Sequence, residues 1–351
     1  MNKLGLKDGG NIFIYSYGAM LLMQVAVSVY AIVKAVYAGQ TDAAEISLNT
    51  MLIVILNQVI YMFVPYLYGR SRRIYMSAET GLFGRAGIKE YLLTAAISPL
   101  CIMAFLPLAL VFVYVFSLLG YSGSDIGVDG GFLTLTITLC VLPALGEETL
   151  FRGSLAGSLR HKGYGYAIIM SALIFSLAHG SPSQTVHQFC LGAVLAYIFF
   201  VTNDIKPAML LHFLNNFISI ILDSVNVPFL NMEITPLYIL VSLCVSLVAG
   251  IILGAALKLL KAQSLKRAGS KTAGGSYLAD SIKDFCNMFR KGGLKAQIER
   301  LNAEINIIRP GEQIDFCPVD ENGQKIKTPA NIIFAIVLLL LMYIGNTVLS
   351  M

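Results

Sequence analysis

Charged residues are scarce in this chain. Of its 351 residues only 13% are Asp, Glu, Lys or Arg, whereas 56% are hydrophobic and the mean hydropathy is +0.73. A soluble globular domain carries roughly 25% charged residues. The deficit excludes an ordinary soluble domain and favours a chain whose apolar side chains face lipid. The formal net charge of +5 is too small to indicate a nucleic-acid partner.

Several common signatures are also missing. The six cysteines are scattered, without a CxxC pair or zinc-finger spacing, so we expect packed thiols rather than a disulfide framework. No HExxH helix, GxSxG elbow or pair of aspartates within an apolar run occurs. The first apolar run is too long for a signal peptide and lacks a small-residue cleavage site, so we expect no cleaved leader.

Long apolar runs take up most of the sequence. A helix needs about 20 apolar residues to cross the ~30 Å hydrocarbon core of a bilayer. Runs of this kind lie at residues 12–37, 48–69, 91–119, 131–152, 164–180, 185–202, 207–223, 236–260 and 329–350. They predict an all-α, polytopic transmembrane helix bundle of about nine spans.

Basic residues concentrate in three loops, at residues 70–89, 160–162 and 258–271. With nine spans, all three loops fall on the same side as the N-terminus. The excess of Lys and Arg in cytoplasmic loops predicts that the N-terminus and residues 261–328 are cytosolic. Residues 261–328 form the one sizeable polar segment. Their basic first part can rest on anionic headgroups, and apolar residues recur at helical spacing over 293–308.

Ionisable and carboxamide side chains gather near the ends of three apolar runs. The fourth run ends with Glu147, Glu148 and Arg152, the fifth with His179, and the seventh begins with His212 and Asn216. A charged side chain within a span costs roughly 2.5–3.5 kcal/mol on insertion scales, so such residues are functional candidates.

Helical spacing assigns faces to these residues. Glu148 and Arg152 are four apart and share a face within ion-pairing reach, whereas Glu147 is rotated by about 100°. His212 and Asn216 are also four apart. Glu147 precedes the turn near residue 162 by about as many residues as His179 follows it. In an antiparallel hairpin the two therefore reach similar heights.

This set of groups can hydrolyse an amide bond. Glu147 is the candidate general base for water, and Glu148 is either held by Arg152 or supports that base. His212 and Asn216 can donate hydrogen bonds to the oxyanion of the tetrahedral intermediate. Alternatively, Glu147, His179 and His212 can bind Zn²⁺ and leave a fourth position for water. The sequence leaves metal-bound and metal-free water open.

Purely structural roles stand beside these chemical ones. Glu148 and Arg152 can form a structural ion pair, and a histidine at a helix end such as His179 is often a packing residue. Of the other two histidines, His161 lies in a basic loop and is expected to be solvated, while His187 opens the sixth run. A cluster from three neighbouring runs in an otherwise uncharged bundle favours the chemical roles.

Three motifs carry a family resemblance. The pattern EExxxR at 147–152, FxxxH at 175–179 and HxxxN at 212–216, in that order, resembles the motifs of the CPBP family. That family groups type II CAAX prenyl endopeptidases with bacteriocin-processing and self-immunity (Abi) proteins. The resemblance implies an intramembrane endopeptidase that acts on membrane-associated peptides or proteins, with Glu147, His179, His212 and Asn216 as essential residues. Members are commonly called metalloproteases, and a metal-free, glutamate-activated mechanism has also been proposed.

The resemblance divides the chain. Residues 131–225 hold the CPBP- or Abi-like catalytic helices, flanked by N-terminal transmembrane helices in 1–120, a transmembrane helix at 236–260, the polar segment 261–328 and a C-terminal transmembrane helix at 329–351. The expected partners are the lipid bilayer and a peptide or protein substrate near it. The rival function is a non-catalytic immunity or secretion-accessory protein that binds a peptide partner. A transporter predicts inverted repeats, which the sequence does not show.

Overall fold

A computed structural model describes residues 2–38, 43–121, 130–225, 235–270, 276–310, 314–315 and 324–349. Within these ranges the chain is helical, and the one β-bridge joins Asn2 and Ile74. Eight helices of the described residues are long and apolar enough to cross a membrane. The predicted all-α, polytopic membrane bundle is therefore confirmed.

The helices follow one another with short connections. The first four are α1 (Leu6–Ala38), α2 (Ala43–Arg72), α3 (Met76–Glu79) and α4 (Ile88–Ser117). A continuous helix from Phe132 to Lys162 comprises α5 (Phe132–Leu135), η1 (Thr136–Val141), α6 (Leu142–Glu147), η2 (Glu148–Ala156), α7 (Gly157–Leu159) and η3 (Arg160–Lys162). The others are α8 (Tyr164–Ala178), α9 (Pro182–Thr202), α10 (Ile205–Ser224), α11 (Pro236–Arg267), α12 (Tyr277–Met288), α13 (Gly293–Ile308) and α14 (Ala330–Leu349).

Several helices extend beyond the predicted spans, and one is shorter than a lipid-crossing helix. The predicted fifth span, 164–180, is α8, which has 15 residues and a length of about 22 Å, less than the ~30 Å hydrocarbon core. Most of α8 is buried inside the bundle, so its length need not match the lipid. The fourth span continues beyond residue 152 to Lys162. Of the nine predicted spans, eight are thus helices long enough to cross a membrane within the described residues, and the fifth is a short inner helix.

The turn between this long helix and α8 is as tight as the sequence predicts. Gly163 adopts φ +99°, a left-handed conformation that favours glycine. Its N–H donates to the Arg160 carbonyl at 2.8 Å. The two helices therefore form the antiparallel hairpin on which the height comparison of Glu147 and His179 depends.

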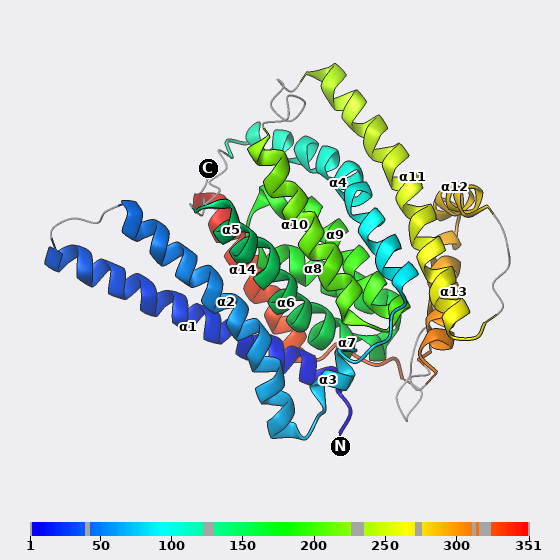
Figure 1. Cartoon of the computed structure of the whole chain (residues 1–351), viewed down its shortest axis with the longest axis horizontal. Coiled ribbons are helices and arrows are strands. Elements are labelled where there is room, and N and C mark those ends of the chain that lie inside the picture. The colour runs from blue at the N-terminus through cyan, green and yellow to red at the C-terminus, as the bar shows by residue number, and fades with distance from the viewer. Residues whose placement is uncertain are drawn as a thin grey trace.

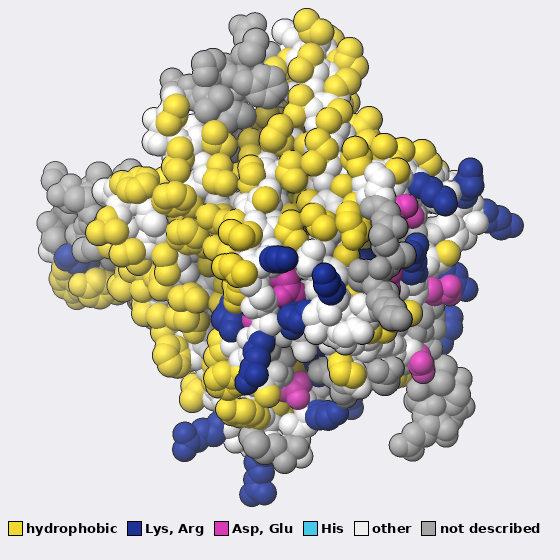
Figure 2. Space-filling model, turned by 45° about the vertical axis from the view of Figure 1, so that its right-hand side comes forward, with side chains coloured by type: hydrophobic (Ala, Val, Ile, Leu, Met, Phe, Trp, Pro, Cys, Tyr) yellow, Lys and Arg dark blue, Asp and Glu magenta, His cyan; other side chains and the backbone are white. Residues whose placement is uncertain are grey.

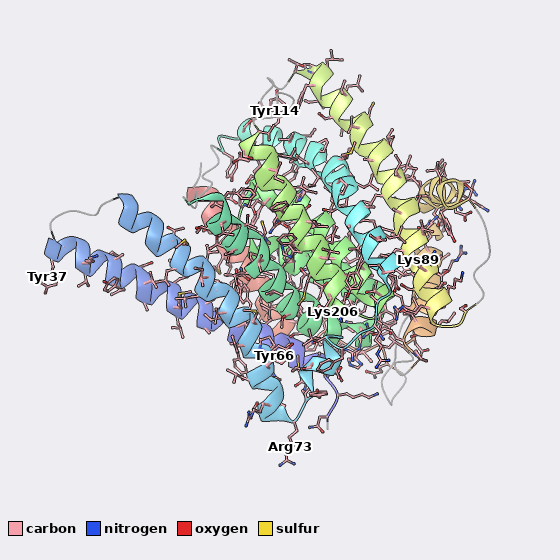
Figure 3. All side chains as sticks on the ribbon, in the orientation of Figure 1. Tyr37, Tyr66, Arg73, Lys89, Tyr114 and Lys206 are labelled. Atoms are coloured by element: carbon pink, nitrogen blue, oxygen red, sulfur yellow. The ribbon has the colours of Figure 1, made fainter. Side chains whose placement is uncertain are left out.

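The molecule has a basic end and an apolar body. Figure 1 places the N-terminus, α3 and the start of α8 near one end, with α12 and α13 beside α11 on the right. Figure 3 shows Arg73 and Lys206 toward this end, whereas Tyr37 and Tyr114 lie at the opposite side. Hydrophobic side chains cover the left and upper parts of Figure 2, and Lys and Arg cluster over its lower and right parts. We call the end with Arg73 and Lys206 the basic end.

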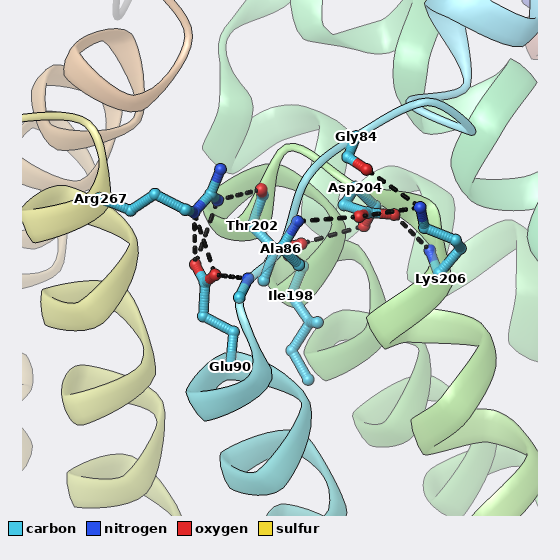
Figure 4. Close-up of polar contacts among 9 residues, drawn as sticks. Gly84, Ala86, Glu90, Ile198, Thr202, Asp204, Lys206 and Arg267 are labelled. Atoms are coloured by element: carbon cyan, nitrogen blue, oxygen red, sulfur yellow. Dashed lines mark hydrogen bonds and ion pairs between the residues drawn. The ribbon is translucent and has the colours of Figure 1, made fainter.

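A buried carboxylate joins α4 to α11 at the basic end (Figure 4). Glu90, in the first turn of α4, is 2% exposed. Its Oε2 accepts the Gly87 N–H at 2.5 Å and lies 3.0 Å from Arg267 Nε. Arg267 Nη2 also donates to the Thr202 carbonyl at 2.5 Å. The end of α11 is thereby fixed to the start of α4 and the end of α9.

A second buried carboxylate fixes the start of α10 (Figure 4). Asp204 caps α10, because its Oδ1 accepts the Lys206 N–H at 3.0 Å. Its Oδ2 accepts the Ala86 N–H at 3.1 Å, and Lys206 Nζ donates to the Gly84 carbonyl at 3.0 Å. These contacts tie α10 to the loop before α4. They set the position of the helix that carries His212 and Asn216.

The polar segment packs on the bundle rather than hanging from it. Its second helix, α13, has the bounds predicted from helical spacing. Asn302 Oδ1 accepts the N–H of Tyr164 at 3.0 Å, which satisfies a free donor in the first turn of α8. The Arg309 guanidinium lies over the rings of Phe199 and Phe200, 5.4 and 5.6 Å from their centroids.

Candidate active site

The two adjacent glutamates lie where the long helix widens. The segment η2, from Glu148 to Ala156, is π-helical. Two hydroxyl side chains in this segment bond to backbone carbonyls of the same long helix. Thr149 Oγ1 donates to the Leu145 carbonyl at 2.7 Å, and Ser154 Oγ donates to the Thr149 carbonyl at 3.0 Å. Such π-helical turns are rare and occur often at functional sites.

Glu148 and Arg152 form a fully buried ion pair. Arg152 Nη1 lies 3.1 Å from Glu148 Oε1, and both side chains are at most 1% exposed. Arg152 Nη2 also donates to the Gly192 carbonyl of α9 at 3.4 Å. Because the pair lies on one helix and is removed from solvent, the two side chains compensate each other locally.

His212 of α10 contacts both glutamates. Its Nδ1 lies 2.8 Å from Glu148 Oε1, and its Nε2 lies 3.8 Å from Glu147 Oε2. A carboxylate only accepts hydrogen bonds, so Nδ1 of His212 is the donor and Nε2 faces Glu147. The imidazole is thus oriented by Glu148, which is in turn held by Arg152.

Glu147 is more accessible than its neighbour. Its side chain is 14% exposed, whereas that of Glu148 is 0% exposed. Glu147 Oε1 accepts from Gln58 Nε2 of α2 at 3.1 Å. The other oxygen, Oε2, has no hydrogen-bond partner among the described residues. Glu147 therefore holds one buried acceptor oxygen without a partner beside His212, while the side chain as a whole is 14% exposed.

A close helix contact brings Gln58 to Glu147. A Cβ atom at Gly146 would lie 2.6 Å from Gln58 Oε1 and 2.7 Å from the Gln58 carbonyl oxygen. Only glycine allows α2 and α6 to approach this closely. Tyr17 and Tyr61 also lie within electrostatic range of the Glu147 carboxylate. Sequence reasoning missed these three residues, because neutral side chains inside apolar runs carry no distinctive spacing.

His179 caps the short inner helix α8 and is partly exposed. Its Nδ1 lies 2.8 Å from the Phe175 carbonyl oxygen. A carbonyl oxygen only accepts, so Nδ1 carries a hydrogen and donates it. The His179 ring packs against Phe175, which also contacts the ring of His212. His212 lies 3.8 Å from Glu147, so His179 is joined to the cluster through Phe175 and His212.

The ring of Phe175 connects the three motifs. Its centroid lies 4.7 Å from that of His179 and 5.9 Å from that of His212, both in edge-to-face geometry. The Arg152 guanidinium carbon lies 4.2 Å from the same centroid. One buried aromatic ring thus packs against a side chain from each of the other helices and restricts their orientations.

Asn216 is anchored to the backbone of the long helix. Its Nδ2 donates to the Leu139 carbonyl oxygen, in the π-helical segment η1, at 2.8 Å. Asn216 thereby ties α10 to the long helix. An amide nitrogen carries two hydrogens, so a second donor of Asn216 remains.

The other two histidines lie in different settings. His187 of α9 is near the cluster, since Asn215 Nδ2 lies 3.4 Å from its Nε2 and His179 is within electrostatic range. Asn215 was not singled out by the sequence. His161 Nε2 lies 2.8 Å from the Leu4 carbonyl oxygen and so holds the N-terminal segment. The sequence predicted a solvated side chain, whereas His161 is only partly exposed.

The spacing of the donor side chains bears on metal binding. Among the described residues, no three His, Cys, Asp or Glu side chains are grouped closely enough to hold a metal ion. In both His179 and His212, Nδ1 is bonded to oxygen, which leaves Nε2 of each ring for water, substrate or a metal.

Comparison with known proteins gives one match. Residues 129–218 match the family model described as type II CAAX prenyl endopeptidase Rce1-like. The matched segment contains all six candidate residues and agrees with the resemblance carried by the motifs. No curated protein and no solved structure matches the chain. The match supports a membrane-embedded protease of the CAAX type.

Proposed function

We propose that this protein is an intramembrane endopeptidase that hydrolyses peptide bonds of membrane-associated peptides or proteins, with water activated by Glu147. The observation that carries the proposal is a division within the cluster. Glu147, His179 and Asn216 are partly exposed, whereas Glu148, Arg152 and His212 are buried behind them. The more exposed side chains, which would meet the substrate, thus lie against buried charged residues that orient the cluster.

The first step is attack by water. Glu147 Oε2, which has no other partner in the described structure, takes a proton from water as general base. The water oxygen attacks the carbonyl carbon of the peptide bond and forms a tetrahedral intermediate. His179 accepts from the same water through Nε2 and aligns it. Gln58 holds the second oxygen of Glu147 and keeps the carboxylate in one orientation.

The second step stabilises the oxyanion. His212, oriented by Glu148, faces the oxyanion with Nε2, and Asn216 donates through its second amide hydrogen. Fixed donors of this kind act on charge that develops in the transition state, and the loss of one costs about 10²–10³-fold in rate. The anchoring of Asn216 to the Leu139 carbonyl and of His212 to Glu148 keeps both side chains in place.

The final step is collapse of the intermediate. The carbon–nitrogen bond breaks, and Glu147 returns its proton to the leaving amine nitrogen. Water and peptide are consumed, and a carboxylic acid and an amine are formed, which become a carboxylate and an ammonium group by transfer of one proton, so the protons balance without any further reactant. The same glutamate serves first as base and then as acid.

Cleavage of defined peptides tests the proposal. The full chain in proteoliposomes would be given membrane-tethered peptides with C-terminal CAAX sequences, prenylated and unprenylated. Removal of a general base typically costs 10²–10⁴-fold, so Glu147→Gln should reduce cleavage by about that factor. Glu299→Gln, an exposed change of the same kind on α13, should retain full activity. Full activity in Glu147→Gln would refute the assignment.

Two further measurements complete this test. Metal analysis of the purified protein, and cleavage after treatment with a chelator, decide whether Zn²⁺ takes part through Glu147, His179 and His212. Cleavage that persists without metal supports the side-chain mechanism, and cleavage that returns only with Zn²⁺ overturns it. A non-catalytic immunity or secretion protein would retain its cellular effect in Glu147→Gln, which separates that function from proteolysis.

A further inference from the structure

Helix α12 presents an apolar face that no other described element covers. Leu278, Ile282, Phe285 and Phe289 follow one another at spacings of four, three and four, so they share one face of the helix. All four are exposed, from 40% for Phe285 to 74% for Phe289. A soluble surface rarely shows such a row, and on a membrane protein it is typical of an interfacial helix.

The packing of α12 places it at the edge of the apolar layer. Ser281 Oγ donates to the Ile251 carbonyl of α11 at 3.1 Å, and Asp284 lies 2.7 Å from Lys258. Residues 236–257 of α11 contain no charged side chain. At 1.5 Å per residue they span about 33 Å, close to the thickness of the hydrocarbon core. Helix α12 therefore crosses α11 where lipid gives way to water.

The direction of α12 fits the same position. Figure 1 shows α12 nearly end-on, whereas α11 beside it runs along the page. The axis of α12 is thus steeply inclined to that of the spanning helix. A helix across the spans at this depth lies along the membrane surface, with its exposed apolar row available to the acyl chains.

Basic side chains line a cavity beside α12. This cavity has a volume of about 840 Å³ and lies between α11, α12 and α13. Three of its basic residues have acidic partners, because Lys258 pairs with Asp284 while Lys261 and Arg300 share Glu304.

The other three basic residues of this cavity are Lys283, Arg290 and Lys291. Within the described chain none of them has an acidic partner inside 4 Å, and all three are exposed. They leave positive charge at the membrane surface, directly beside the apolar row.

We propose that α12 is an interfacial helix that binds anionic phospholipid. Its apolar row enters the acyl region of the leaflet at the basic end, and Lys283, Arg290 and Lys291 bind the lipid phosphate groups. Basic residues beside a buried apolar row are the recognised combination for such binding. The inference rests on packing and charge outside the candidate active site, so it stands independently of the peptidase proposal.

The chain contains no tryptophan, so the fluorescence of a single introduced tryptophan reports on its own position alone. Phe289→Trp in the full chain, placed in phosphatidylglycerol vesicles, should be quenched by brominated acyl chains and protected from acrylamide. Asn287→Trp, on the cavity side of α12, should behave in the opposite way. Phe334→Trp on α14, 57% exposed on a spanning helix, is the positive control for lipid contact.

Lipid charge is tested with the same probe. Combining Phe289→Trp with Lys283→Gln, Arg290→Gln and Lys291→Gln, or replacing phosphatidylglycerol with phosphatidylcholine, should weaken quenching by brominated lipid and restore quenching by acrylamide. Equal quenching in both lipids would overturn the role of the phosphate groups. Quenching by acrylamide but not by brominated lipid would overturn lipid contact and indicate a solvated face. Protection from acrylamide that disappears when the protein is diluted in lipid would also overturn lipid contact and indicate a self-associating face.

Discussion

The contact between Gly146 and Gln58 gives the sharpest prediction, Gly146→Ala. The added Cβ would lie 2.6–2.7 Å from Gln58 oxygens and 3.1 Å from its Cα. Two of these atoms are backbone, so α2 must move. Overpacking of this kind costs about 1–3 kcal/mol, against a gain of about 0.5–1 kcal/mol for alanine over glycine in a helix. The hydrogen bond from Gln58 to Glu147 should lengthen, and cleavage should fall about 10-fold.

Gly250→Ala is the matched control, because Gly250 lies within α11 and nothing is within 4 Å of its added Cβ. This variant should gain about 0.5–1 kcal/mol in stability without loss of activity. Both variants would be measured by denaturant unfolding in micelles and by peptide cleavage. If Gly146→Ala matched Gly250→Ala in both assays, the close approach of α2 would have no part in holding Glu147.

Two further predictions concern buried carboxylates. Arg152→Met should destabilise the fold by about 3–5 kcal/mol, since it removes the arginine from a buried ion pair and leaves Glu148 with His212 alone. Adding Glu148→Gln should recover much of this loss in the same unfolding assay, and no recovery would argue against charge as the cause. Glu90→Gln should cost about 1–3 kcal/mol by weakening its bonds to Arg267. Glu299→Gln, from an exposed pair, should change unfolding by less than about 0.5 kcal/mol.

Some of the cluster follows from sequence and physical rules. The spacing of Glu148 and Arg152 predicts their shared face, and the residue count on either side of Gly163 predicts comparable heights for Glu147 and His179. A charged side chain within a span is costly unless it is paired or faces the bundle interior, so the spacing of such residues predicts where they lie. The bounds of α13 follow from helical periodicity alone.

Other parts depend on contacts between distant segments. Nothing near Gln58 in the sequence distinguishes it, and its role comes from the absence of a side chain at Gly146. The length of α8 is set by burial, so the rule for lipid-crossing helices overestimates it.

The ion pair on the long helix has a consequence for biogenesis. A translocon receives this helix before α10 exists, so His212 is not yet available to Glu148. Because Arg152 lies one turn away on the same segment, the nascent helix enters lipid with that charge already compensated. Glu147 meets Gln58 of the earlier helix α2, and the reactive centre is completed only when α10 joins the bundle.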